Sequence, residues 1–188
     1  MSIIKQDING LFRNEMPFFK RFTGELIPST QFQLERIKDQ HIAVIGIDQH
    51  IARQLYDICL NAASVQVFPM TQPHWILPHT PKLIQTLIYH PLVVKNRRLF
   101  NQRVKSLIAL RFLDREVKNP WLKRQLTPNQ AITKKDFLKS DTYYQALQLK
   151  NCHLNTWPIK YIDADLIHDL QGNRHKVSCI ISNLNTET

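Results

Sequence analysis

The segment from His41 to Phe68 constrains the fold most strongly, because it has the pattern of a strand, a helix and a second strand. The run HIAVIG is short, apolar and closed by Gly46, which is typical of a buried parallel strand. SVQVF, Ser64–Phe68, is a second β-rich run. Between them, apolar residues recur at helical spacing: Ile51, Leu55, Ile58 and Cys59. The pattern predicts a βαβ unit with a right-handed crossover and hence an α/β fold, Rossmann-like in its start.

The rest of the chain is expected to extend this unit. Residues 1–35 are interpreted as an N-terminal lead-in of short helical turns and loop, and residues 36–188 as the domain itself. Trp75–Pro81 is expected to be a proline-punctuated loop. A helical insertion is predicted over about 82–126, with helices at Lys82–Tyr89 and Leu92–Val117.

The C-terminal third is predicted to hold little helix. Tyr143–Leu149 reads as a short helix. The segment that follows reads as a strand, then a β-hairpin around Gln171-Gly172-Asn173, then a last strand at Lys176–Ile181. The DAD sequence at Asp163–Asp165 is expected in a turn rather than in an acid–base site.

Composition excludes several classes of protein. The chain has 188 residues, enough to bury a real core. No apolar run reaches the ~18 residues that a membrane-spanning helix needs, and the N-terminus lacks the apolar region of a signal peptide. The three cysteines are odd in number and far apart, so we expect reduced, buried thiols in a cytoplasmic protein.

Three stretches of the sequence follow the order of one known domain. HIAVIG, a helix, SVQVF and HWILP come in sequence, preceded by FFKRFTGELIPST and followed by LKRQLTPNQAITKKDFLKSDTYYQALQLKNCHL. Together they resemble the second, NADPH-binding Rossmann domain of class B flavin monooxygenases, the Baeyer–Villiger and related flavin-containing enzymes. The resemblance covers roughly Met16 to Ile181. It implies a domain that, in the family, works with NADP and with a neighbouring FAD domain.

The phosphate-binding turn departs from the family pattern G-x-G-x-x-A or -G. It reads Gly46-Ile47-Asp48-Gln49-His50-Ile51, so only the first glycine matches. The second glycine lets the backbone approach a pyrophosphate, whereas Asp48 places a negative charge there. Two like charges at about 4 Å repel by a few kcal/mol at intermediate dielectric. We expect Asp48 to cap the helix and impair nucleotide binding, and Ile51, in place of a small residue, to push the helix off the strand.

Two further family positions differ. The arginine that meets the 2′-phosphate of NADPH in the family corresponds to Met70, and no acidic residue follows the strand to bind a ribose hydroxyl. A family Lys-Arg pair, which holds the 2′-phosphate and stabilises the flavin peroxide, corresponds to Lys134-Lys135. Lys135, at the catalytic arginine position, lacks the planar guanidinium, so no catalytic residue is predicted. Gly46 and Lys134 remain as cofactor-binding candidates; the alternative is that both lysines are merely solvated.

The function predicted from these departures is that of a non-catalytic or weakly nucleotide-binding stand-alone domain, acting as a binding or interaction protein or surviving as a relic. No N-terminal G-x-G-x-x-G of an FAD domain and no A-T-G motif after KVSCII are present, and the flavin carries the oxygen chemistry in such enzymes. NADP is therefore expected to bind weakly if it binds, and no FAD site is visible. The alternative is the NADPH-binding piece of a split monooxygenase, with an FAD domain as protein partner.

A third hypothesis comes from charge. Lys and Arg number 25 against 15 Asp and Glu, a formal net charge of +10. Several cations lie on the predicted amphipathic helix Leu92–Val117, among them Arg97, Arg98, Arg103 and Lys105. These could meet nucleic acid or an anionic surface, although no helix-turn-helix, zinc or RNP signature supports nucleic acid. The eight histidines show no metal-ligand spacing, so no metal site is predicted.

Overall fold

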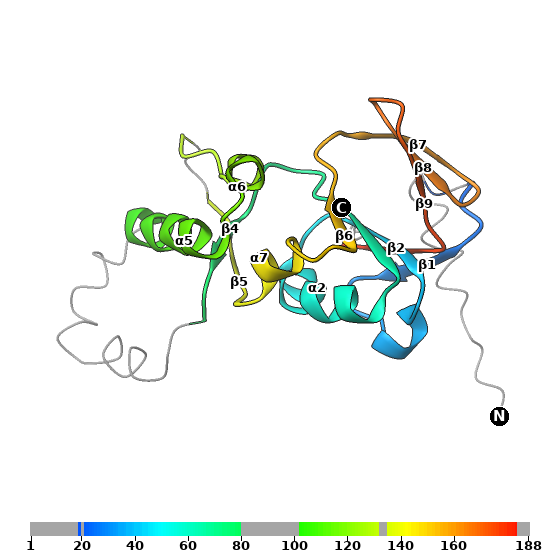
Figure 1. The fold of residues 1–188 in the computed structure, drawn as a ribbon, viewed down its shortest axis with the longest axis horizontal. Helices are drawn as coiled ribbons and strands as arrows, with labels where there is room; N and C mark the ends of the chain where they lie inside the picture. Colours follow the sequence, from blue (N-terminus) through cyan, green and yellow to red (C-terminus); the bar gives the residue numbers. More distant parts are fainter. Residues whose placement is uncertain (1–18, 20, 80–101, 132–134, 184–188) are drawn as a thin grey trace.

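A five-stranded parallel sheet forms the centre of the computed structural model, which describes residues 19, 21–79, 102–131 and 135–183 (Figure 1). The strand order is β1-β10-β2-β3-β6, and each neighbouring pair is parallel. The strands are β1 (Glu25–Pro28), β10 (Cys179–Ser182), β2 (His41–Ile45), β3 (Ser64–Phe68) and β6 (Cys152–Leu154). The predicted α/β, Rossmann-like fold is confirmed.

The predicted βαβ unit lies at the middle of this sheet. Helix α2 (Gln49–Asn61) connects β2 to β3, which pair from His41 opposite Ser64 to Ile45 opposite Phe68. Successive side chains of a strand point to opposite faces. In β2, Ile42 and Val44 accordingly join the core cluster that contains α2, whereas Ala43 and Ile45 join a second cluster on the other face. Both faces are buried, which explains the nearly continuous apolar run in the sequence.

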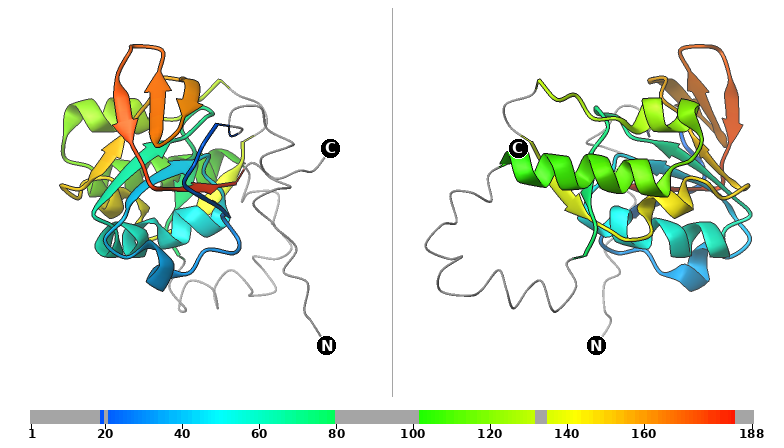
Figure 2. Two further views of the ribbon diagram at one scale, coloured as in Figure 1. Left: turned by 90° about the vertical axis from the view of Figure 1, so that its right-hand side faces the viewer. Right: turned by 60° about the vertical axis from the view of Figure 1, so that its left-hand side comes forward.

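The two faces of the sheet are covered by different kinds of structure (Figure 2). Helix α2 lies on one face, in contact with the 3-10 helix η2 (Leu34–Ile37) and helix α7 (Tyr143–Ala146). On the other face lies an antiparallel sheet of β7 (Ile159–Asp163), β8 (Leu166–Asp169) and β9 (Arg174–Lys176). The side chains of Phe19 and Phe22 are buried in the same cluster as Ile162 and Ile167 of this sheet.

The predicted helical insertion is present and lies to one side of the central sheet (Figure 1). It contains α5 (Gln102–Glu116) and α6 (Pro120–Leu126). Before and after them run β4 (Trp75–Leu77) and β5 (Phe137–Lys139), which pair in parallel. The predicted helix Lys82–Tyr89 and the first part of Leu92–Val117 lie outside the described residues. In the described ranges no helix is long and apolar enough to cross a membrane.

Three sequence-based expectations were wrong in detail. Trp75–Leu77 is a strand rather than a loop, since it pairs with β5. The local sequence does not show this, because β5 lies far away in the chain. Glu25–Pro28 is the edge strand β1 rather than turns and loop, so the sheet extends across residue 35. The predicted last strand divides into β9 and β10 with a break at Val177-Ser178, because β9 pairs in one sheet and β10 in another.

Other local predictions agree with the structure. The hairpin β8–β9 turns at Leu170–Asn173, and Ala164-Asp165 turns between β7 and β8. All three cysteines are free and buried. The amphipathic prediction for α5 holds for Phe112, which is buried, but Leu107 and Ile108 are 61% and 42% exposed.

Candidate functional site

The turn between β2 and α2 is closed around Gly46. Gly46 has φ +76°, in the left-handed region that favours glycine, and its N–H donates to the carbonyl oxygen of Phe68 at 2.8 Å. A Cβ atom added to Gly46 would lie 1.7 Å from Oδ1 of Asn183. The side chain of Asn183, directly after β10, therefore occupies the space beside this turn. Sequence reasoning had not singled out Asn183.

Asp48 caps α2, as predicted from the sequence. Its Oδ1 accepts a hydrogen bond from the backbone N–H of Ile51 at 2.8 Å, which satisfies one of the free donors at the helix N-terminus. Its Oδ2 accepts a second hydrogen bond from the hydroxyl of Ser29. Ile51 itself is fully buried in the core cluster with α2. A protein carboxylate thus stands at the end of the helix where anions are favoured.

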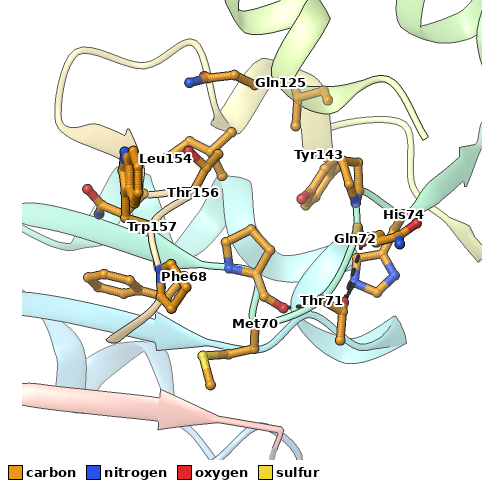
Figure 3. Close-up of a pocket in the computed structure, with 15 residues that line it drawn as sticks. Phe68, Met70, Thr71, Gln72, His74, Gln125, Tyr143, Leu154, Thr156 and Trp157 are labelled. Carbon is orange, nitrogen blue, oxygen red and sulfur yellow. Dashed lines mark hydrogen bonds between the residues drawn. The ribbon is translucent and has the colours of Figure 1, made fainter. Parts of the chain in front are cut away.

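A cavity of about 610 Å³ opens at the carboxyl ends of β3 and β6 (Figure 3). The loop Pro69–His74 after β3 and the loop Asn155–Pro158 after β6 form most of its wall, and α6 and α7 complete it through Gln125, Leu126 and Tyr143. In open α/β sheets, ligands bind outside the carboxyl ends of the strands. Because Gly46 is hydrogen-bonded to Phe68, which lines the cavity, the cavity and the turn are neighbours.

Met70, which the sequence resemblance predicts at the position of the 2′-phosphate arginine, lies at the edge of this cavity (Figure 3). It is 46% exposed and has φ +62°, a left-handed backbone that a non-glycine residue seldom adopts. Such conformations cost free energy and gather at functional sites. The loop after β3 is therefore held in an unusual backbone conformation at Met70.

His74 is the titratable imidazole of the cavity wall. Burial lowers its pKa below the usual value, and the nearby Asp136 carboxylate opposes this shift only in part. The imidazole is therefore neutral at pH 7. Its Nε2 lies 3.3 Å from the hydroxyl of Thr71, so it is tied to the same loop.

Lys135, which the sequence resemblance predicts at the position of the catalytic arginine, makes its contacts away from the cavity. Its Nζ donates to the hydroxyl of Ser106 at 3.2 Å and lies 4.5 Å from the centroid of the Trp75 ring. It is absent from the described lining of the cavity. The structure therefore does not bring Lys135 together with Gly46 and Met70. Lys134 lies outside the described residues.

Two of the four cations predicted on the basic helix face lie within the described residues. Arg103 and Lys105 are exposed on α5, and Lys105 Nζ lies 5.8 Å from the ring centroid of Phe137. Arg97 and Arg98 lie outside the described residues. A nucleic-acid or anionic-surface role for these residues stays a prediction, testable by whether DNA affinity falls with salt. Among the described residues, no group of His, Cys, Asp or Glu could hold a metal ion.

Comparison with known proteins first defines the class. No family model matches the chain. Solved structures with the same fold include cyclohexanone-bound cyclohexanone monooxygenase in the Rotated conformation, with TM-score 0.68 and 12% identity over 90% of this chain and 45% of that one. Another is oxidized steroid monooxygenase bound to NADP, with TM-score 0.63 and 18% identity over 87% of this chain and 42% of that one. The fold is that of a Rossmann-like part of flavin-type monooxygenases.

Two proteins with similar sequences give a more specific comparison. A Baeyer–Villiger monooxygenase of Pseudomonas aeruginosa is 28% identical over 185 aligned residues, covering 86% of this chain and 35% of that protein. The FAD-binding monooxygenase ktnD of Aspergillus niger is 27% identical over 169 residues, covering 76% of this chain and 28% of that protein. The chain thus resembles Baeyer–Villiger-type monooxygenases, as predicted, and spans about a third of the length of these relatives.

Sequence reasoning missed most of the cavity. Gly46, Asp48 and Met70 were singled out from motif positions, but Tyr143, Asn155 and Trp157 were not. The carboxyl ends of neighbouring parallel strands meet at one edge of a sheet, so this rule would place the loop after β6 beside the loop after β3. Applying the rule requires knowing that β6 pairs with β3, which the local sequence does not show.

Proposed function

We propose that this chain is a Rossmann-type binding module that holds NADP(H) weakly and does not catalyse oxygenation by itself. The proposal rests on the similarity to flavin-type monooxygenases and on the two side chains, Asp48 and Asn183, that stand at the turn between β2 and α2. Free, buried thiols fit a reducing compartment, and a cytoplasmic location is part of the same proposal.

The observation that carries the proposal is the hydrogen-bonded cap of Asp48. Both carboxylate oxygens already accept hydrogen bonds, from Ile51 and Ser29. A pyrophosphate at this turn would meet a like charge, and it would compete for the N–H groups that otherwise attract phosphate. Asn183 adds a side chain beside Gly46, so both charge and space oppose a nucleotide phosphate.

Calorimetric titration with NADP⁺ tests the proposal. The wild type is expected to bind in the millimolar range or more weakly. The double variant Asp48→Gly with Met70→Arg should bind about tenfold tighter or better, because it removes the competing carboxylate and supplies a phosphate ligand. Asp48→Asn is the matched control, since it removes the charge but keeps a capping side chain.

Two results would contradict the proposal. Micromolar binding of NADP⁺ by the wild type would show that the Asp48 cap does not oppose the nucleotide. Equal, weak binding by wild type, Asp48→Asn and the double variant would show that neither position controls affinity.

A second candidate function is favoured by the share of the relatives that the chain matches. Because it aligns with about a third of each curated relative, it could supply the nucleotide domain of a larger monooxygenase in which an FAD domain is the partner. Mixing the chain with such a flavin-loaded domain should then produce NADPH oxidation that neither part shows alone. Absence of any rate increase on mixing would reject this candidate.

A further inference from the structure

The cavity beside β3 and β6 differs from the rest of this protein in its charge. The whole chain carries a formal net charge of +10, yet none of the fifteen described residues that line the cavity is Lys, Arg, Asp or Glu. His74 is neutral at pH 7, because burial lowers its pKa. Burial likewise raises the pKa of the Tyr143 phenol, so that group stays protonated. The cavity wall is therefore uncharged.

Aromatic and amide side chains shape this wall. Trp157 and Leu154 lie on one side and Tyr143 and His74 on the opposite side, with Phe68 and Met70 along the lower edge (Figure 3). The indole of Trp157 is 50% exposed although it stands at the cavity. Flat faces of this kind stack well on a ring.

Polar groups in the cavity wall can orient a ligand without charge. The amide of Gln125 is drawn at the upper edge of the opening (Figure 3). Thr156 and Asn155 contribute a hydroxyl and an amide from the loop after β6. A mostly apolar pocket with a few placed polar groups is the usual form of a small-molecule site.

We propose that this cavity binds an uncharged, ring-containing small molecule with hydrogen-bonding groups. An ionised ligand would lose its hydration without gaining a charged partner from the wall. A neutral ring would bury apolar surface against Trp157 and Tyr143 and could reach the amide of Gln125. This inference goes beyond the proposed function and does not depend on the affinity for NADP(H).

Two fluorescent probes with the same aromatic framework test the proposal. N-phenyl-1-naphthylamine is uncharged, and 8-anilino-1-naphthalenesulfonate carries a sulfonate. Each is titrated into the full chain at low and high salt. The neutral probe is expected to bind saturably, about tenfold tighter than the sulfonate at high salt, where the attraction of the net positive charge for anions is screened. Its affinity should not change with salt.

Variants locate the bound probe. Trp157→Ala should weaken binding of the neutral probe about tenfold. Trp121→Ala is the matched control, because Trp121 is also an exposed tryptophan (68%) but does not line the cavity; it should bind like the wild type. Gln125→Lys should shift the preference towards the sulfonate. Far-UV circular dichroism and thermal melting check that each variant is folded.

Several results would overturn the proposal. These are no saturable binding of the neutral probe, equal losses in Trp157→Ala and Trp121→Ala, or tighter binding of the sulfonate at high salt. The proposed function is tested separately, by NADP⁺ calorimetry. Micromolar NADP⁺ binding would reject the proposed function, whereas the neutral-ligand proposal would still be decided by the probe experiment.

Discussion

At the scale of single residues, the pair Gly46 and Asn183 shows how closely the turn after β2 is packed. Gly46 needs its left-handed backbone, and Asn183 fills the space where a side chain would stand. Oδ1 of Asn183 is buried and accepts no hydrogen bond from the described residues. Such a group costs free energy unless another interaction compensates.

Gly46→Ala should destabilise the fold by about 2 kcal/mol or more, from overpacking against Asn183 and from the unfavourable φ. The double variant with Asn183→Ala should recover the steric part but not the backbone part. Urea unfolding of the two single variants and the double variant measures this coupling. If the loss of stability in the double variant equals the sum of the two single losses, the contact with Asn183 contributes nothing to the destabilisation by Gly46→Ala.

Met70→Asn is expected to raise the free energy of unfolding by about 0.5 to 1 kcal/mol. Asparagine tolerates the left-handed conformation better than methionine, and Met70 is nearly half exposed, so little packing is lost. Met70→Ala, which has no such tolerance, is the control and should not be stabilised. The measurement is the midpoint of urea unfolding, which reports a change in stability when the dependence of the unfolding free energy on urea concentration is unchanged.

At the scale of elements, the stability of α2 depends on its cap. Asp48→Ala should cost about 1 kcal/mol, because the N–H of Ile51 loses its acceptor. Asp48→Asn should stay close to the wild type, since its carbonyl oxygen can accept the same bond. Chemical unfolding of both variants checks this, and an equal loss in both would mean that the charge, not the hydrogen bond, stabilises the helix.

The hairpin β8–β9 should be sensitive to acid through Asp169. Burial by itself raises the pKa of this carboxyl, but hydrogen bonds from the side chain and backbone of Asn173, from His175 and from the Gln171 backbone together lower it below the usual value. Asp169 Oδ1 accepts from Asn173 N at 2.9 Å, and Oδ2 from Asn173 Nδ2 at 2.9 Å. These bonds favour the ionised form.

A depressed pKa stabilises the folded state above the pKa of the unfolded chain, and this stabilisation is lost as pH falls through the lower, folded value. Urea midpoints measured from neutral pH down to pH of about 3 should therefore fall more steeply for wild type than for Asp169→Asn. Asp163→Asn, at the end of β7 in the same sheet, is the control and should follow the wild type. Parallel curves for all three proteins would contradict this prediction.

At the scale of the whole molecule, the sequence predicted those elements whose partners adjoin them in the chain, and it missed those defined by distant partners. His41–Phe68 was correct in type and order, because one strand, one helix and one strand adjoin in the sequence. β4 and β1 were missed, because three- or four-residue strands such as Trp75–Leu77 and Glu25–Pro28 are defined by distant partners. The cavity was missed for the same reason, since two loops far apart in the chain form it.

The cysteines should report unfolding of the whole molecule. A side-chain hydrogen bond with Cys152, together with burial, raises the pKa of Cys59, and burial raises the pKa of Cys179 to about 12. Because the thiolate is the reactive form, the native protein should not react quickly with Ellman's reagent at pH of about 8. All three thiols should react after guanidinium unfolding. One rapid native thiol would show local opening.

The position of β10 has a consequence for the order in which this protein can be made. β10 lies between β1 and β2 in the sheet and pairs with both, although it follows all the other described strands in the sequence. Until a ribosome has released residues as late as Ser182, β1 has no neighbour and β2 has one open edge. The sheet therefore closes only after β10 has been synthesised, and until then the unpaired edges are exposed to chaperones and to other nascent chains.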